Sequence, residues 1–248
     1  MAGHSKFSNI KHRKGAQDAK RGKIFAKLGR EITVAAKGGG DIAFNPRLRT
    51  AIVAAKAENM PKDKIENAVR KGVGGGEGEN YEEMRYEGYG TGGVAIIVEA
   101  LTDNKNRAAS DIRSTFSKHG GNLGESGSVN FMFENIGLLK YKTEGVSEEE
   151  IFEVALEAGA ENCELEDDMY EVSCPKELFS VVRDALFEKF GDPQFAGLWW
   201  TPKTTTPIDE SQASTLFKMI DVLEDNDDVQ NVFANFDISD EVMEKLSQ

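Results

Sequence analysis

The first thirty residues of the sequence are crowded with cationic side chains. They contain nine Lys and Arg residues against one acidic residue, Asp18, so this segment carries a net charge of +8. The cations recur every two to four residues over much of the segment, at Lys6, Lys11, Arg13, Lys14, Lys20, Arg21, Lys23, Lys27 and Arg30. Cations at this density bind the phosphates of nucleic acid, because each contact releases condensed counterions. The segment therefore predicts a surface that binds a polyanion through its backbone.

Charge is sorted along the whole chain. Residues 1–72 hold seventeen Lys and Arg against six Asp and Glu, a balance of +11, whereas residues 73–248 carry −24 and the protein −13. A solvated helix usually alternates the signs of its charges, so this imbalance favours binding over a merely solvated face. The acidic part would repel phosphate. We therefore expect nucleic acid to meet residues 1–72 alone.

The expected nucleic-acid footprint combines the basic arm, which is the segment before the helix that begins at Ala16, with the first two predicted helices. Phe7 is an aromatic residue that can stack on a base or enter a groove. His4 and His12 have no third ligand nearby, so we interpret them as phosphate-facing rather than as a metal pair. The nucleic-acid-binding residues predicted from sequence are His4, Lys6, Phe7, Lys11, His12, Arg13, Lys14, Lys20, Arg21, Lys23, Arg47 and Arg49. Nothing in their spacing distinguishes DNA from RNA.

Other chemistry finds little support in the sequence. Residues 88–93, GYGTGG, fit the G-x-G-x-x-G pattern of dinucleotide-binding proteins, but they precede a predicted strand instead of following one. The glycine-rich stretch 72–78 lacks the Gly-Lys-Ser/Thr of a phosphate-binding loop. The two cysteines, Cys163 and Cys174, make no disulfide framework. No set of nucleophile, base and orienting residue can be named, so we expect no enzyme activity, no cofactor and no metal.

Helices are predicted for the basic part of the chain. An apolar stripe from Phe25 to Ala35 predicts a helix that begins at Ala16 and ends before Gly38. Asn45 as cap and Pro46 at the first position predict a second helix, and a third is expected between Pro61 and Gly72. The composition of residues 72–83 is that of a linker.

Strands and helices alternate in the acidic part. We expect a strand at 94–101, a helix from Asn104 to Lys118 and a strand at 129–133. Residues 138–201 then predict the order β-α-β-β-α-β of a ferredoxin-like unit, with Ser147 and Glu150 as a capping box. A helix at 210–223 and a strand at 229–236 follow.

The predicted fold class is α+β, with three domains. The last helix and strand cannot bury both faces of a sheet alone, so we expect them to complete the sheet that begins at residue 94. The predicted domains are a basic helical domain at 1–78, a discontinuous α/β domain at 79–134 plus 206–248, and a ferredoxin-like α/β domain at 135–205 inserted into it.

Several motifs resemble the YebC/PmpR family. They include AGHSK at residues 2–6, KHRK at 11–14, NPRLR at 45–49, NMPKD at 59–63, YEGYG at 86–90, LTDN at 101–104 and GGNLG at 120–124. The family commonly has Trp where this chain has Phe7, which keeps an aromatic face but lacks the indole N–H. The resemblance implies three domains and a cytoplasmic, non-enzymatic regulator of gene expression.

The resemblance leaves two functions open. Bacterial members are usually described as DNA-binding transcriptional regulators, which is the reading we adopt. The alternative is a ribosome-associated translation factor that acts on stalled ribosomes through contacts with RNA. This alternative follows from relatives that include a mitochondrial translational activator. We expect the acidic domains to contact protein partners, either the ribosome or the transcription machinery. No membrane partner is expected, since no apolar run approaches about 20 residues.

Overall fold

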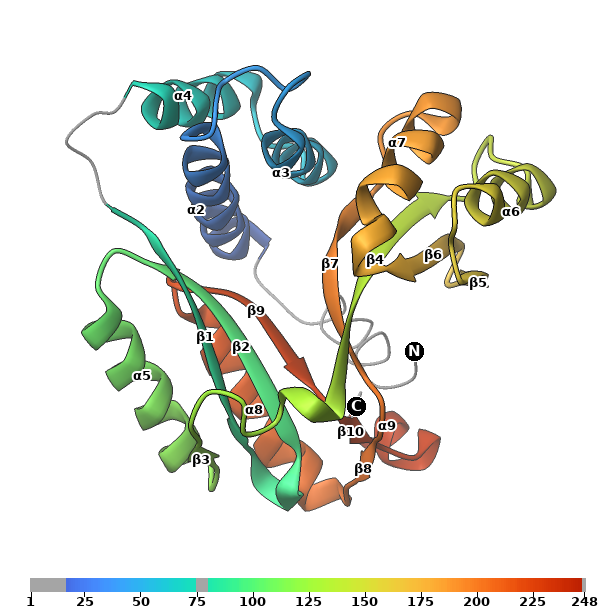
Figure 1. The fold of residues 1–248 in the computed structure, drawn as a ribbon. Coiled ribbons are helices and arrows are strands. Elements are labelled where there is room, and N and C mark those ends of the chain that lie inside the picture. Colours follow the sequence, from blue (N-terminus) through green and yellow to red (C-terminus); the bar gives the residue numbers. More distant parts are fainter. Residues whose placement is uncertain (1–16, 75–79, 247–248) are drawn as a thin grey trace. The chain divides into compact units, whose positions relative to one another are not determined.

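The computed structural model describes residues 17–74 and 80–246 (Figure 1). These residues fall into two compact units. One unit holds residues 17–27, 80–134 and 201–246, and the other holds residues 28–74 and 135–200. Each unit combines segments that are distant in the sequence. Helix α2 (Gln17–Ala36) contributes its first part to one unit and its second part to the other.

The first unit is built on a four-stranded sheet in the order β3-β1-β2-β9. Its strands are β1 (Glu82–Tyr89), β2 (Ala95–Thr102), β3 (Asn122–Leu123) and β9 (Val229–Ala234). Strand β2 is antiparallel to both β1 and β9, and its apolar run AIIVEALT is almost wholly buried. Strand β9 therefore pairs with β2, the strand predicted at 94–101, although about 130 residues of chain separate the two strands.

Two helices cover this sheet and share its core. They are α5 (Lys105–Lys118) and α8 (Glu210–Asp225). Ile112 and Phe116 on α5 pack with Leu216 and Ile220 on α8 and with Ile96 on β2. Both helices have side-chain caps: Asn104 accepts from the Arg107 N–H, and Asp209 and Gln212 form a capping box. Smaller elements complete the unit: turns η1 (Thr91–Gly93) and η2 (Asn130–Met132), a parallel pair of β8 (Thr206–Pro207) and β10 (Phe236–Asp237), and α9 (Asp240–Leu246).

The second unit contains the remaining helices of the basic segment. Helix α3 (Pro46–Ala57) begins where Asn45 accepts from the Leu48 N–H, and α4 (Lys62–Val73) begins after Pro61. Helices α2 and α4 approach closely at Gly72, where a Cβ atom would lie 2.3 Å from the Thr33 carbonyl oxygen. Glycine at this position therefore lets the two backbones meet.

A ferredoxin-like layer forms the rest of the second unit. Its elements are β4 (Phe133–Lys142), α6 (Glu148–Glu157), β5 (Asn162–Glu166), β6 (Met169–Pro175), turn η3 (Lys176–Leu178), α7 (Phe179–Phe190) and β7 (Phe195–Pro202). The strand order is β5-β6-β4-β7, and β6 is antiparallel to both of its neighbours, β5 and β4. Ile151 and Val182 from the helices pack on Leu139 and Val172 of the sheet. The predicted β-α-β-β-α-β order is confirmed.

The structure corrects three local predictions. Residues 82–83, assigned to the linker, are two exposed acidic residues that begin strand β1. The strand predicted at 129–133 is instead the turn η2, because the Val129 and Asn130 N–H groups bond to the Glu87 carboxylate and not to a neighbouring strand. Ser147 precedes α6 but makes no side-chain cap, so the predicted capping box is wrong.

The α+β class, with a helical N-terminal region followed by α/β sheets, is confirmed. The three separate domain boundaries stay a prediction, since the described residues divide into two units. No helix within residues 17–74 and 80–246 is long and apolar enough to cross a membrane.

Candidate nucleic-acid interface

Seven of the predicted binding residues lie outside the described part of the chain: His4, Lys6, Phe7, Lys11, His12, Arg13 and Lys14. Lys20 is described only as part of helix α2. The geometry of the interface can therefore be built from four predicted residues, which are Arg21, Lys23, Arg47 and Arg49. The structure adds the cations around them.

On helix α2, Arg21 contacts an aromatic ring of the same helix, whereas Lys23 and Lys27 contact helix α8. The Arg21 guanidinium lies 5.3 Å from the centre of the Phe25 ring, a cation–π contact within the helix. Lys23 Nζ lies 3.4 Å from Asp225 Oδ2 and donates to the Asp225 carbonyl at 3.2 Å. Lys27 Nζ donates to the Glu224 carbonyl at 2.5 Å. Both lysines thus meet the C-terminal end of α8, where the helix dipole favours cations.

Arg47, at the start of α3, is held by a carboxylate. Its Nε donates to Glu31 Oε1 at 2.8 Å and its Nη2 donates to Glu31 Oε2 at 3.2 Å. Because two donors of the guanidinium fork are occupied, a phosphate would have to displace Glu31. The pair is solvent-exposed, and such pairs contribute roughly 0–1 kcal/mol, so the exchange costs little.

Arg49 is more fully engaged. Its Nε donates to the Ile42 carbonyl at 3.2 Å and its Nη2 to the Ala43 carbonyl at 3.4 Å. Its Nη1 lies 3.4 Å from Asp184 Oδ1, and the Phe187 ring centre is 5.9 Å from the guanidinium carbon. Three sides of the guanidinium are therefore occupied within its own unit. This arrangement fits a residue that positions the loop before α3 better than one that binds a phosphate.

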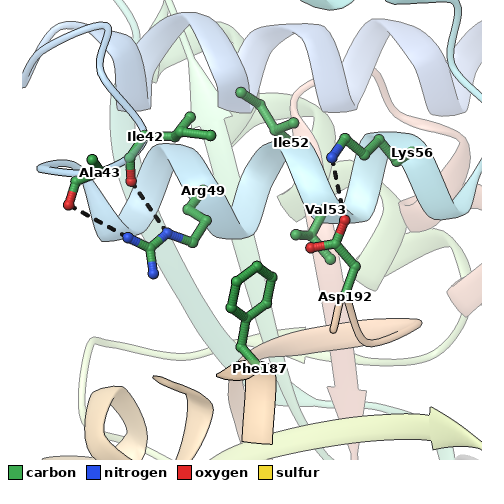
Figure 2. Close-up of a pocket in the computed structure, with 8 residues that line it drawn as sticks. All are labelled: Ile42, Ala43, Arg49, Ile52, Val53, Lys56, Phe187 and Asp192. Atoms are coloured by element: carbon green, nitrogen blue, oxygen red, sulfur yellow. Dashed lines mark hydrogen bonds and ion pairs between the residues drawn. The ribbon is translucent and has the colours of Figure 1, made fainter. Parts of the chain in front are cut away.

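A pocket of about 370 Å³ lies beside Arg49 within this unit (Figure 2). Its walls are mainly apolar, and Lys56 Nζ pairs with Asp192 Oδ2 at 3.2 Å along its lining. The Phe187 ring points toward helix α3 in the same view. The lining residues are Ile42, Ala43, Arg49, Ile52, Val53, Lys56, Phe187 and Asp192. Its charged groups are already paired, so the pocket offers packing surface and not an evident set of catalytic groups.

The sequence reasoning missed a second group of cations. Lys37, Arg70 and Lys71 lie at the C-terminal ends of α2 and α4, which meet at Gly72. All three are exposed, and the described part of the chain gives their side chains no ion pair or hydrogen bond. The available signal was a Lys or Arg in the last turn before glycine, a position that normally indicates helix termination. These residues can accept a phosphate without losing a partner.

Two buried acidic groups in the acidic part have structural partners. Asp228 accepts from Thr102 Oγ1 at 3.0 Å and from Arg107 Nη2 at 2.8 Å. The hydrogen bonds that Arg107 donates to Asp228 and to Asp103 raise the pKa of Arg107. Glu87 holds the backbone of residues 129–130. These carboxylates fix loops and helix ends.

Comparison with known proteins identifies relatives that match most of the chain. Residues 5–75 match the model of the TACO1/YebC protein N-terminal domain, and residues 81–236 match that of the TACO1/YebC second and third domain. The chain is also similar to a solved structure, that of the conserved hypothetical protein Aq1575 from Aquifex aeolicus. The sequences are 47% identical, the match covers 90% of this chain and 93% of that one, and the TM-score is 0.81.

Proposed function

The chain belongs to the TACO1/YebC family, and we propose that it is a nucleic-acid-binding regulator of gene expression. Within that class we propose a DNA-binding transcriptional regulator, the function commonly attributed to the family. In this proposal residues 1–72 bind the nucleic acid and the acidic remainder orients the protein and contacts protein partners. The protein acts by binding, without catalysis.

The observation that carries the proposal is the segregation of charge. Residues 1–72 carry +11 in a chain whose total is −13. The acidic remainder repels a polyanion, so binding is directed to one part of the molecule. On the described helices, Arg70 and Lys71 are exposed with no ion pair among the described residues, and Lys23 and Arg47 are held in exposed ion pairs that exchange at little cost.

Phosphate contacts, and not base contacts, dominate in this proposal. Direct readout in a major groove uses side chains such as Arg with two free donors for a base edge. On α3, Arg47 is engaged by Glu31, and Arg49 by Asp184 and two carbonyls. Contacts to the backbone fix position without reading sequence. We therefore expect modest sequence selectivity and a strong dependence of affinity on salt.

The test measures how DNA binding depends on salt concentration when cations of the basic arm are neutralised. Lys11, Arg13 and Lys14 are changed together to Gln, and binding to labelled duplex and single-stranded DNA is measured at several salt concentrations. The slope of log K against log salt should flatten by about 0.9 per lost contact on duplex and about 0.7 on single strands. An unchanged slope would remove these residues from the footprint.

A matched triple variant controls for the loss of positive charge. Lys118, Lys142 and Lys176 are exposed lysines in the acidic part of the chain, so the triple Lys→Gln change there removes the same charge. It should leave the slope unchanged. A slope that falls equally in both triple variants would contradict a footprint confined to residues 1–72.

A ribosome-associated translation factor is the second candidate. The engagement of the α3 arginines fits this function as well, because double-stranded RNA is also recognised mostly through shape and backbone. Sedimentation of the protein with ribosomes, lost when residues 1–30 are deleted, would support this function. Sequence-selective footprints on promoter DNA at physiological salt would instead support transcriptional regulation.

A further inference from the structure

Phe44 is an unusual residue in the basic segment. Its exposed fraction, 86%, is the highest among the large apolar residues of the described chain. Burying a Phe side chain stabilises a fold by about 1.5–3 kcal/mol, so the chain forgoes that stabilisation here. Ile42, two residues earlier, is 47% exposed. The segment of residues 38–45, which we call the Phe44 loop, thus presents apolar side chains to solvent.

The tip of the Phe44 loop is fixed by its own hydrogen bonds. The Ala43 N–H donates to Asp41 Oδ1 at 2.9 Å, and the Phe44 N–H donates to the Asp41 carbonyl at 3.2 Å. Arg49 reaches back from α3 to the carbonyls of Ile42 and Ala43. The backbone on both sides of the tip is therefore held, and Phe44 is kept away from the core.

Asn45 fastens the loop to the helices that flank it. Its Nδ2 donates to the carbonyls of Ala35 and Gly39, each at 2.7 Å, and its Oδ1 accepts from the Leu48 N–H at 3.0 Å. Asn45 is itself only 8% exposed. One buried side chain thus links the end of α2, the loop and the start of α3, and the exposed aromatic ring stands on a preorganised support.

The charge around this support indicates the kind of partner. Residues 28–74 contain nine Lys and Arg and five Asp and Glu, a balance of +4 in a chain of −13. Exposed Lys37 and Arg47 flank the Phe44 loop in the sequence. A single projecting ring beside cations suits a base, because every base presents a π-face and its phosphate meets the cations. Unpaired bases offer that face directly, whereas a duplex must first be unstacked at a cost of a few kcal/mol.

We propose that Phe44 is the residue on which an unpaired nucleobase stacks when the basic segment binds nucleic acid. This inference rests on the proposed function and deepens it, since it assigns the base-contacting residue. Lys and Arg side chains supply the salt-dependent part of the affinity. Phe44 supplies a part that depends on the base and not on salt. Arg49 and Asn45 are positioning residues that hold the loop in place.

The experiment compares Phe44→Ala with wild type on two single-stranded oligonucleotides of equal length. One is a fluorescein-labelled DNA with bases, and the other has abasic sites at successive central positions, so its phosphates are kept. The dissociation constant is measured at several salt concentrations. Phe131→Ala is the matched control, since Phe131 is 67% exposed and lies in turn η2 of the other unit.

Phe44→Ala should weaken binding to the DNA with bases by roughly 5- to 150-fold at every salt concentration, with an unchanged salt slope. It should bind the abasic DNA as wild type does, and Phe44→Trp should restore binding to the DNA with bases. Phe131→Ala should match wild type on both. Equal affinity of Phe44→Ala and wild type, or an equal loss on the abasic DNA, overturns the inference while leaving the proposed function standing. Failure of wild type to bind any nucleic acid overturns both.

Discussion

Glu87 provides the sharpest test of how the acidic part of the chain is held together. Its side chain is buried on strand β1, and its Oε2 accepts hydrogen bonds from the Val129 and Asn130 N–H groups, each at 3.0 Å. Its Oε1 lies 3.2 Å from Arg85 Nε. A single carboxylate therefore fixes the backbone of a loop that follows it by about forty residues.

The expected loss of folding stability follows from the backbone N–H groups that a substitution of Glu87 leaves without an acceptor. Glu87→Ala removes the acceptor of two N–H groups, one buried and one half-buried. A buried donor left unsatisfied costs about 1–3 kcal/mol, so we expect a loss of roughly 2–5 kcal/mol. Glu87→Gln keeps one acceptor oxygen but loses the charge, and we expect about 1–3 kcal/mol. Either value is a large part of a typical stability of 5–15 kcal/mol.

The stability should also depend on pH in a defined direction. Burial raises the pKa of Glu87, but hydrogen bonds from the backbone of Val129, Gly127 and Asn130 and the charge of Arg85 outweigh it, so the pKa is lowered. A lowered carboxyl pKa contributes stability that is present above the unfolded value, about 4.3, and lost as pH falls through the folded value. The difference between wild type and Glu87→Gln should therefore be full at pH 7 and shrink below about pH 4.

The assay is urea unfolding across pH, with hydrogen exchange of the Val129 and Asn130 amides as a local readout. Both amides should exchange faster in Glu87→Gln. Glu125→Gln is the control, because Glu125 is exposed in the same loop, and it should change neither quantity. A variant at Glu87 as stable as wild type at pH 7, or a difference that grows toward low pH, would refute the reasoning.

Three further predictions concern the basic segment. Gly72→Ala should lower the free energy of unfolding by about 2 kcal/mol or more, since the new Cβ would lie 2.3 Å from a carbonyl oxygen of α2. Gly22→Ala, whose Cβ would have no atom within 4 Å, should raise the free energy of unfolding by up to about 1 kcal/mol. Melting temperatures that shift in the same direction in calorimetry would contradict this prediction. Asn45→Asp keeps the cap acceptor but loses two donors, so urea unfolding should show a loss of about 1–3 kcal/mol, and Asn45→Ala should lose about 1 kcal/mol more. Glu31→Gln should remove the carboxylate that competes with phosphate for Arg47 and steepen the salt slope of duplex binding by up to about 0.9, a gain that adding Arg47→Gln should abolish. A slope that does not change would place Arg47 outside the footprint.

Helix ends and turns that are determined by neighbouring residues in the chain were predictable from the sequence. Asn45 was expected as a helix cap and a second helix was expected to begin at Asn104, and each of these side chains accepts from the backbone N–H three residues later. The predicted β-α-β-β-α-β order requires a turn between two successive strands, and the structure forms it at Asp167 and Asp168, which both adopt positive φ. In these cases the residues that decide the structure lie within a few positions of one another, so composition and spacing suffice.

Elements that depend on a distant partner were not predictable. Strand β1 begins with two exposed acidic residues, Glu82 and Glu83, which made its start resemble a linker, and it is stabilised by pairing with β2. Turn η2 has the apolar alternation of a strand, but Glu87 binds its backbone from 42 residues away. Spacing within a window cannot show which of two competing partners a backbone N–H group will have.

In the candidate site, too, local features could be predicted and features that depend on a distant partner could not. Counting Lys and Arg located the basic segment, and no structure was needed for that. The count could not show that Arg47 pairs with Glu31 across 16 positions or that Arg49 bonds to the loop before it. It also gave no weight to Phe44, since an apolar residue in a loop is exposed or buried according to how its backbone is held.

These partners redistribute the expected footprint. A cation held by a carboxylate gains less from a phosphate, because the existing ion pair must first be broken, whereas an unpaired cation gains the whole contact. Arg47 and Lys23 are held in this way by Glu31 and Asp225. Lys37, Arg70 and Lys71 have no such partner within the described residues. We therefore expect phosphates on the described helices to gather at the ends of α2 and α4. The Phe44 loop starts at the α2 end, so a strand held there by its phosphates has an aromatic ring close by in the chain on which to place a base.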